Sequence, residues 1–206
     1  MAVVTSELQR RLFPVYFLVD ASGSMSENGK WKVAHELVMQ CVQHFKDSPD
    51  PDFETFVQLL VLKDSNLVVQ YVEEQITQLD PHELQGGGHS GYSIGIERVT
   101  ELLEESQLPQ NAHPPCLVLV GDGHVDASFE HVLVNSLKSE SFLRTTRIVV
   151  KVGNDFETEL IRKFLSVSSN FFTVMDFATM PFFYMRLASL ISSQATQTRS
   201  RRIISG

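Results

Sequence analysis

The sequence predicts an α/β protein with a doubly wound, mostly parallel six-stranded sheet that carries helices on both faces. Two observations predict this fold. Short, continuously apolar segments, typical of strands buried on both sides, alternate with segments whose apolar residues recur every three or four positions, as in amphipathic helices. This alternation runs along nearly the whole chain, and strand–helix alternation is typical of parallel sheets. A chain of 206 residues has the size of one such domain.

The first half of the chain contains three of the expected strands and two of the expected helices. A turn-rich tetrad at 63–66 separates the second and third strands, which therefore form a hairpin and place one antiparallel strand at a sheet edge. A polar stretch and three glycines at 86–88 precede the second helix. In chain order the elements are a strand at 14–19, a helix at 34–45, strands at 55–62 and 67–72, and a helix at 96–103.

The second half repeats strand and helix more regularly. Strands are expected at 116–120, 147–152 and 171–175, and helices at 129–137, 156–164 and 183–191. Neither an internal repeat nor a linker is evident. The sequence therefore predicts one domain over 1–194, followed by a flexible Ser/Thr/Gln-rich tail over 195–206.

Composition excludes several classes of function. A net charge of −8 argues against a nucleic-acid surface. The apolar runs are far shorter than the roughly 20 residues that cross a bilayer, and the first residues lack the pattern of a secretory signal. The only two cysteines, Cys41 and Cys116, lie in apolar surroundings and are interpreted as reduced, buried thiols. We therefore expect a cytoplasmic protein without a nucleic-acid or membrane partner.

Oxygen-bearing side chains follow two of the predicted buried strands and the glycine-rich turn. Asp20, Ser22 and Ser24 come directly after the first strand, Asp122 follows a central strand, and Ser90 follows the three glycines. Ligands of open parallel sheets bind at the carboxyl ends of the strands. Two carboxylates and three hydroxyls form a hard donor set, which suits Mg²⁺, with Mn²⁺ or Ca²⁺ as alternatives. These residues are the predicted metal ligands.

Each of these segments also has a simpler explanation when it is taken alone. Asp20 with Ser22, or Ser90, could cap a helix, and the Gly-Asp-Gly around Asp122 is a common turn. Their joint placement after two buried strands favours the cation site. His89 and His124 adjoin the proposed ligands and would favour a softer metal if they reached it. Residues 86–91 also fit Gly-x-Gly-x-x-Gly, but no buried strand precedes them, which argues against a nucleotide site.

The three segments together resemble a known family. Residues 20–25 (DASGSM) resemble the Asp-x-Ser-x-Ser signature of von Willebrand factor A domains, which opens their metal-ion-dependent adhesion site. Residues 86–96 (GGGHSGYSIGI) resemble the second loop of that site, with Ser90 where a threonine is usual. Residues 118–123 (VLVGDG) resemble the third element. Residues 10–19 further resemble stand-alone bacterial domains of the tellurium-resistance TerY type.

The resemblance implies a Rossmann-like fold and a function without catalysis. It implies that Ser22, Ser24 and Ser90 approach a divalent cation closely, and that Asp20 and Asp122 complete its shell directly or through water. One coordination position would stay open for a Glu or Asp of a partner protein. No small-molecule substrate is expected. The narrower resemblance implies a bacterial stress-response or signalling setting.

Two other hypotheses belong to different classes. A magnesium-dependent phosphohydrolase would also place an Asp after the first strand, as the phosphorylated nucleophile. Such enzymes of the haloacid-dehalogenase type need a second Asp two positions later, where this chain has Ser22. A structural scaffold with a decayed site would bind no cation at all.

Overall fold

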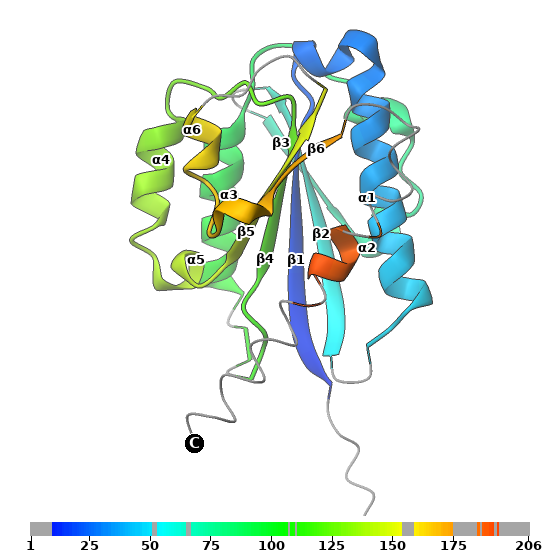
Figure 1. The fold of residues 1–206 in the computed structure, drawn as a ribbon, viewed down its shortest axis with the longest axis vertical. Helices are drawn as coiled ribbons and strands as arrows, with labels where there is room; N and C mark the ends of the chain where they lie inside the picture. Colours follow the sequence, from blue (N-terminus) through cyan, green and yellow to red (C-terminus); the bar gives the residue numbers. More distant parts are fainter. Residues whose placement is uncertain are drawn as a thin grey trace, which may run out of the picture.

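The described part of the chain forms one mixed sheet with helices on both faces (Figure 1). The structure is a computed structural model. It describes residues 10–50, 53–64, 67–106, 108–109, 111–153, 159–174, 185, 187–191 and 193. The predicted tail at 195–206 and the first part of the predicted last helix lie outside these residues.

The sheet has six strands in the order β3-β2-β1-β4-β5-β6. All neighbouring strands pair in parallel except β2 and β3, so β3 is an antiparallel edge strand. This confirms the predicted fold class. The strands are β1 (Arg11–Asp20), β2 (Phe53–Asp64), β3 (Leu67–Val72), β4 (Cys116–Gly121), β5 (Thr146–Val152) and β6 (Phe171–Val174).

The longer helices agree with the apolar periodicity of the sequence. They are α1 (Lys30–Asp47), α3 (Tyr92–Glu105) and α4 (Phe129–Ser136). Residues 187–191 are also helical. The helix predicted at 156–164 is described only as α6 (Glu159–Arg162), since 154–158 lie outside the described residues, and Phe164 is in a turn. Short elements that the sequence did not predict are η1 (Gly23–Gly29), α2 (Glu73–Ile76), η2 (Pro81–Leu84), α5 (Glu140–Leu143) and η3 (Ser168–Asn170).

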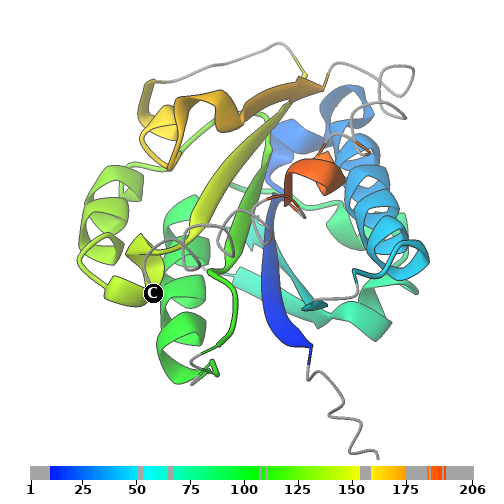
Figure 2. The ribbon, with the colours of Figure 1, turned by 60° about the horizontal axis from the view of Figure 1, so that its bottom comes forward.

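Two apolar cores lie on the opposite faces of the sheet. Alternate residues of β1 divide between them: Val15 and Phe17 pack in the core beneath α1, and Tyr16 and Leu18 pack in the core beneath α3 and α4. The helical turn at 187–191 packs on the α1 side. Figure 2 shows α1 and α3 on the two sides of the sheet. Every β1 residue from Phe13 to Asp20 is buried, as the continuous apolar run predicts.

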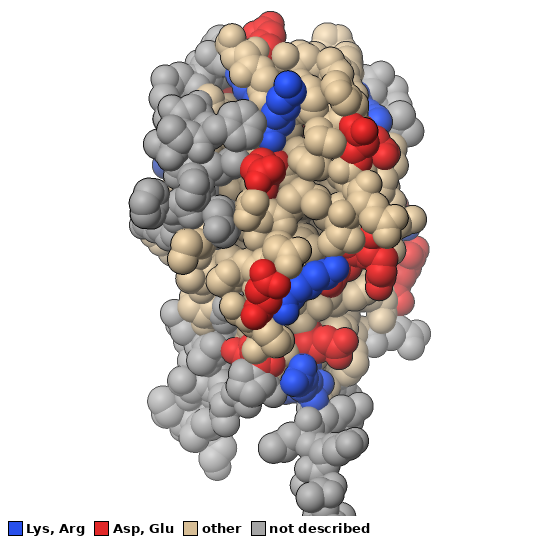
Figure 3. Space-filling model, turned by 90° about the vertical axis from the view of Figure 1, so that its right-hand side faces the viewer, with Lys and Arg blue, Asp and Glu red and all other residues tan. Residues whose placement is uncertain are grey.

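Both cysteines are free and buried, and their burial agrees with the apolar surroundings in the sequence. Burial raises the pKa of both Cys41 and Cys116 far above the ordinary thiol value. Within the described residues, none of the helices combines the length and the apolar character that a membrane crossing requires. The molecular face in Figure 3 carries acidic and basic side chains interspersed with uncharged ones.

Candidate metal centre

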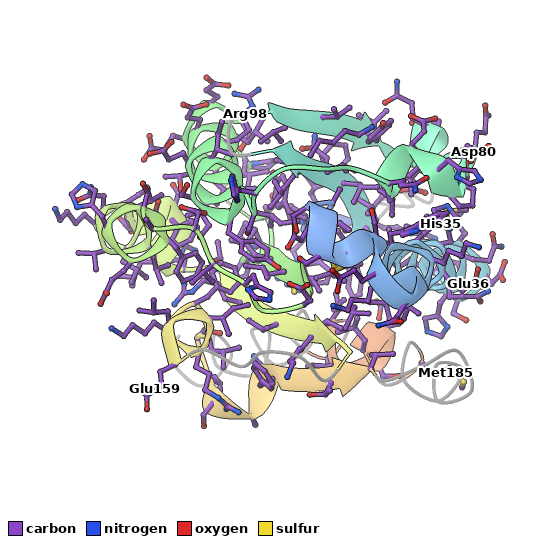
Figure 4. The ribbon with its side chains drawn as sticks, turned by 90° about the horizontal axis from the view of Figure 1, so that it is seen from above. His35, Glu36, Asp80, Arg98, Glu159 and Met185 are labelled. Carbon is purple, nitrogen blue, oxygen red and sulfur yellow. The ribbon has the colours of Figure 1, made fainter. Side chains whose placement is uncertain are left out.

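The candidate site lies where the strand order reverses. The chain proceeds from β1 outward to β2 and β3, then returns to place β4 on the other side of β1. In doubly wound sheets such a reversal opens a crevice at the carboxyl ends of the strands. Asp20 is the last residue of β1, and Asp122 directly follows β4. Figure 4 looks onto this edge, with α1, which carries His35 and Glu36, on one side and α3, which carries Arg98, on another.

The loop after β1 folds around its own carboxylate. Asp20 Oδ1 accepts a hydrogen bond of 2.8 Å from the backbone N–H of Ser22. The hydroxyl oxygens of Ser22 and Ser24 lie 3.2 Å apart. Asp20 and Ser22 are buried, and Ser24 is half-buried. Two of the three predicted oxygens of this loop, those of Ser22 and Ser24, therefore lie together. Ser22 precedes η1 without making a side-chain capping hydrogen bond, so the capping explanation for this segment is wrong.

Two hydrogen bonds join the glycine-rich loop to the loop after β1. The N–H of Gly23 donates a 3.1 Å hydrogen bond to the carbonyl of Gly88. The Ser26 hydroxyl donates one of 3.2 Å to the carbonyl of Gly86. Ser90 is buried just beyond these contacts. The residue that caps α3 is Gly91 rather than Ser90, and it makes no side-chain cap. Helix capping therefore does not explain Ser90 either.

Asp122 lies in a turn and contacts α1. The turn interpretation of Gly-Asp-Gly is correct, because Gly123 adopts a φ of +97° and the N–H of His124 donates a 3.3 Å hydrogen bond to Asp122 Oδ1. The other carboxylate oxygen, Oδ2, lies 3.3 Å from Lys30 Nζ. Asp122 is fully buried. The turn therefore does not exclude a second role, since it places a buried carboxylate on the α1 side of the site.

The two carboxylates interact through the protein interior. Burial raises the pKa of Asp20 to about 6, the Ser22 N–H opposes this rise, and the nearby Asp122 adds to it. Tyr92 is completely buried beside both carboxylates, and burial followed by the charge of Asp20 raises its pKa well above the ordinary value. A cation placed here would offset the repulsion between the carboxylates.

Three buried oxygens of the site lack a hydrogen-bond partner among the residues that the structure describes: Asp20 Oδ2, Ser90 Oγ and Tyr92 Oη. Such atoms are rare in folded proteins, because an unsatisfied buried polar group costs about 1–3 kcal/mol. Two of them belong to the predicted ligand set. The residues present therefore fit a bound hard cation, which accepts oxygen ligands where no donor is available.

Two residues of this region were missed by the sequence analysis. Lys30 begins α1 and contacts Asp122, and the Tyr92 hydroxyl lies at the end of β4. A Cβ at Gly121 would come within 1.8 Å of Tyr92 Oη and 2.8 Å of Asp20 Cβ. A glycine at the end of a buried strand was the available signal, because it marks a close approach.

The alternative of a softer metal site finds no support in the described ranges. No group of three or more His, Cys, Asp or Glu side chains there is placed to hold a metal ion. His89 is exposed, and His124 contacts Asp122 through its backbone N–H. The candidate donors that remain are two carboxylates and the serine hydroxyls.

Solved structures resemble the whole fold. Proximal thread matrix protein 1 from the mussel byssus is 17% identical with a TM-score of 0.64, and the match covers 88% of this chain and 46% of that chain. The same protein, described with a zinc occupied MIDAS motif, is 16% identical with a TM-score of 0.63 over the same shares. The pilus adhesin SpaC from Lactobacillus rhamnosus GG, in an open conformation, is 10% identical with a TM-score of 0.67, over 89% of this chain and 30% of that chain.

The sequence itself identifies the family. The chain spans less than half the length of these structures, and at such identities the likeness concerns the fold. No curated protein matches the sequence. The family model of the von Willebrand factor type A domain matches residues 15–186. The chain therefore belongs to the von Willebrand factor type A family, whose members are typically protein-interaction modules.

Proposed function

We propose that the chain binds a divalent cation and, through it, an acidic side chain of a partner protein. The ligands are Asp20, Ser22, Ser24, Ser90 and Asp122. The observation that carries the proposal is the pair of buried, unsatisfied oxygens, Asp20 Oδ2 and Ser90 Oγ, beside a second buried carboxylate among the described residues. Their placement at the strand reversal matches the place where this type of sheet binds ligands.

The chemistry of the donors supports capture of an anion. The three serine hydroxyls bring no charge, whereas Asp20 and Asp122 bring one negative charge each. A bound divalent ion would supply Lewis acidity towards a further oxygen ligand. Because the serine hydroxyls add no negative charge beyond that of the two carboxylates, a Glu or Asp of a partner can serve as the last ligand. We infer that the domain acts through this contact and without catalysis.

Magnesium suits the set best. All five ligand side chains offer hard oxygen donors, although the mussel protein is described with a zinc occupied MIDAS motif. Mg²⁺ and Mn²⁺ prefer carboxylate, hydroxyl and water ligands, whereas zinc sites are usually built from His and Cys. Ca²⁺ usually takes more protein oxygens than this set supplies.

Calorimetric titration of the chelator-treated protein with MgCl₂ and MnCl₂ tests the cation site. One ion should bind per chain, and Asp20→Ala should abolish the binding while circular dichroism shows an unchanged fold. Asp47→Ala, which removes an exposed carboxylate from the last turn of α1, is the matched control and should bind as the wild type does. Binding that survives in Asp20→Ala would reject the assigned ligands.

A pull-down with immobilised protein tests the partner contact. Proteins retained in MgCl₂ should be released by chelator and absent from the Asp20→Ala column. Retention that is equal with and without chelator would contradict a metal-mediated contact. Hydrolysis of p-nitrophenyl phosphate that is lost in Asp20→Asn would instead support the phosphohydrolase hypothesis.

We further propose the domain limits and setting. The domain would span 1–194, with 195–206 as a tail, which is compatible with the family match at 15–186. The buried free thiols Cys41 and Cys116 favour a reducing, cytoplasmic location. A bacterial stress-response or signalling setting of the TerY type rests on the resemblance of residues 10–19 alone.

A further inference from the structure

Lys30 is a buried lysine at the edge of the candidate site. Its side chain is only 5% exposed, and its Nζ lies 3.3 Å from Oδ2 of the fully buried Asp122. Lysine is among the residues least often buried, and a buried ammonium group is costly unless it is paired with an anion. The environment of Lys30 therefore calls for an explanation.

The position of Lys30 in α1 does not explain why its side chain is buried. Lys30 is the first residue of the helix, where the partial positive charge of the helix dipole disfavours a cation. Lys32 follows two residues later, on the opposite face of the helix, and is exposed with its Nζ 5.3 Å from the ring centre of Trp31. On its buried face, Lys30 forms an ion pair with Asp122.

The charges of the site change with Lys30. Asp20 and Asp122 alone bring two negative charges. The Lys30 ammonium group reduces the sum of the three charges to one negative charge. Lys30 thus neutralises part of the site that a divalent cation would otherwise neutralise. The Lys30 ammonium group also repels a divalent cation that approaches Asp122, and this repulsion is strong where water is excluded.

We propose that Lys30 is a built-in counter-cation that holds Asp122 in place before the metal binds and lowers the affinity of the site for divalent cations. This inference rests on the proposed cation site. It makes Lys30 a positioning residue that sets the affinity of the site. It predicts that removal of the ammonium group destabilises the metal-free protein and, at the same time, tightens metal binding.

Titration of chelator-treated variants with MnCl₂ tests the inference. Lys30→Met should bind Mn²⁺ at least about tenfold more tightly than the wild type, because one repelling charge is removed from a dry site. Lys30→Gln, which keeps a hydrogen-bond donor for Asp122, should fold more readily and show the same direction. Lys30→Arg should stay near the wild type, because it keeps the charge. Lys32→Met is the matched control and should stay within about twofold.

Thermal unfolding separates this role from a purely structural one. Without metal, Lys30→Met should melt lower by on the order of 10 °C, because Asp122 is left buried without its cation. Adding Asp122→Asn to Lys30→Met should recover part of this loss. A lysine that serves structure alone would lower the melting temperature without tightening Mn²⁺ binding.

The outcomes distinguish this inference from the proposed function. If the wild type binds Mn²⁺ and both neutral variants bind it equally or more weakly, the inference is wrong and the cation site stands. If neither the wild type nor the variants bind Mn²⁺, both are wrong. If the neutral variants alone bind Mn²⁺, Lys30 acts as the resident cation of the native site. The inference is then supported, and the proposed function is rejected.

Discussion

At the scale of single residues, Asp20 is in an environment that disfavours its own charge. Burial raises its pKa to about 6, Asp122 adds to the rise, and the hydrogen bond from the Ser22 N–H makes the largest contribution that opposes it. In the unfolded chain the same carboxyl titrates near its ordinary value of 3.8. At neutral pH the metal-free fold therefore holds an ionised carboxylate at a free-energy cost, and a bound cation would remove that cost.

This difference in pKa predicts a characteristic pH dependence. Between pH about 4 and 6 the folded metal-free protein binds a proton at Asp20 that the unfolded chain has released. The stability attributable to this group therefore falls as pH rises through that window, by about 3 kcal/mol in total. Urea unfolding in the presence of chelator, at several pH values, gives the free energy of unfolding of the wild type and of Asp20→Asn. The pH dependence of the difference between the two proteins measures the contribution of Asp20, because Asn does not titrate.

Cation binding should have the opposite pH dependence to the stability of the metal-free protein. A divalent ion requires ionised Asp20, so Mg²⁺ affinity should weaken as pH is lowered through about 6, because protons compete for the carboxylate. Titrations at pH 7 and pH 5 measure this loss, which should reach about tenfold. A wild-type stability that rises relative to Asp20→Asn between pH 4 and 6 without metal would contradict the environment described for Asp20.

Candidate donor residues could be proposed from the sequence, whereas their neighbours in the fold could not. Asp20, Ser22, Ser24 and Asp122 follow buried apolar runs, and that placement is readable from local pattern alone. Lys30 gave no such signal, because a lysine at a helix start is ordinarily solvated and its burial depends on a residue 92 positions away. Tertiary packing decides such contacts, and a single sequence does not record it.

At the scale of elements, the site depends on how two loops fit together. The glycine-rich loop approaches the loop after β1 so closely that a Cβ at Gly86 would lie 1.9 Å from the carbonyl oxygen of Ala21. The hydrogen bonds to Gly88 and Gly86 described above hold the same interface. Because the clash would be with backbone, a side-chain rotation cannot relieve it. Glycine is therefore needed at position 86 because the two loop backbones lie so close together, and not because of an unusual φ.

A pair of glycine substitutions tests this fit. Gly86→Ala should push the loops apart, lower stability by about 1–3 kcal/mol and weaken Mg²⁺ binding at least about tenfold, because Ser90 moves away from Asp20. Gly87→Ala is the matched control: a Cβ there meets nothing within 4 Å, and it should bind normally. Calorimetry with MgCl₂ on both variants gives the comparison. Equal affinities would show that the loop interface does not position the ligands.

Periodicity explains which elements the sequence could predict. The core strands and α1, α3 and α4 bury regular sets of apolar side chains, and these sets follow the two periods that identify strands and helices. The elements α2, η2 and α5 have four residues each, too few to show a period, and each buries a single residue. Strand order depends on long-range pairing, which local periodicity does not record, so the sequence predicted a mostly parallel sheet with an antiparallel edge but not the order of its strands.

At the scale of the whole molecule, the proposed ligands come from segments that only the folded sheet brings together. Asp20 belongs to β1, Ser90 precedes α3 and Asp122 follows β4, and the pairing of β1 with β4 sets the distance between the two carboxylates. Unfolding separates all of them. A cation held by this set therefore binds the native state and has little affinity for the unfolded chain.

Linkage between binding and folding then predicts cation-dependent thermal stability. At a free Mg²⁺ concentration one hundred times Kd, the native state gains about 2.7 kcal/mol, which for a domain of this size raises the melting temperature by about 5–10 °C. The rise should continue with the logarithm of concentration, and NaCl at matched ionic strength should not reproduce it. Asp20→Ala should abolish the rise and Asp47→Ala should keep it. Calorimetric scans that show the same increment in wild type and Asp20→Ala would place the stabilising ion elsewhere on the molecule.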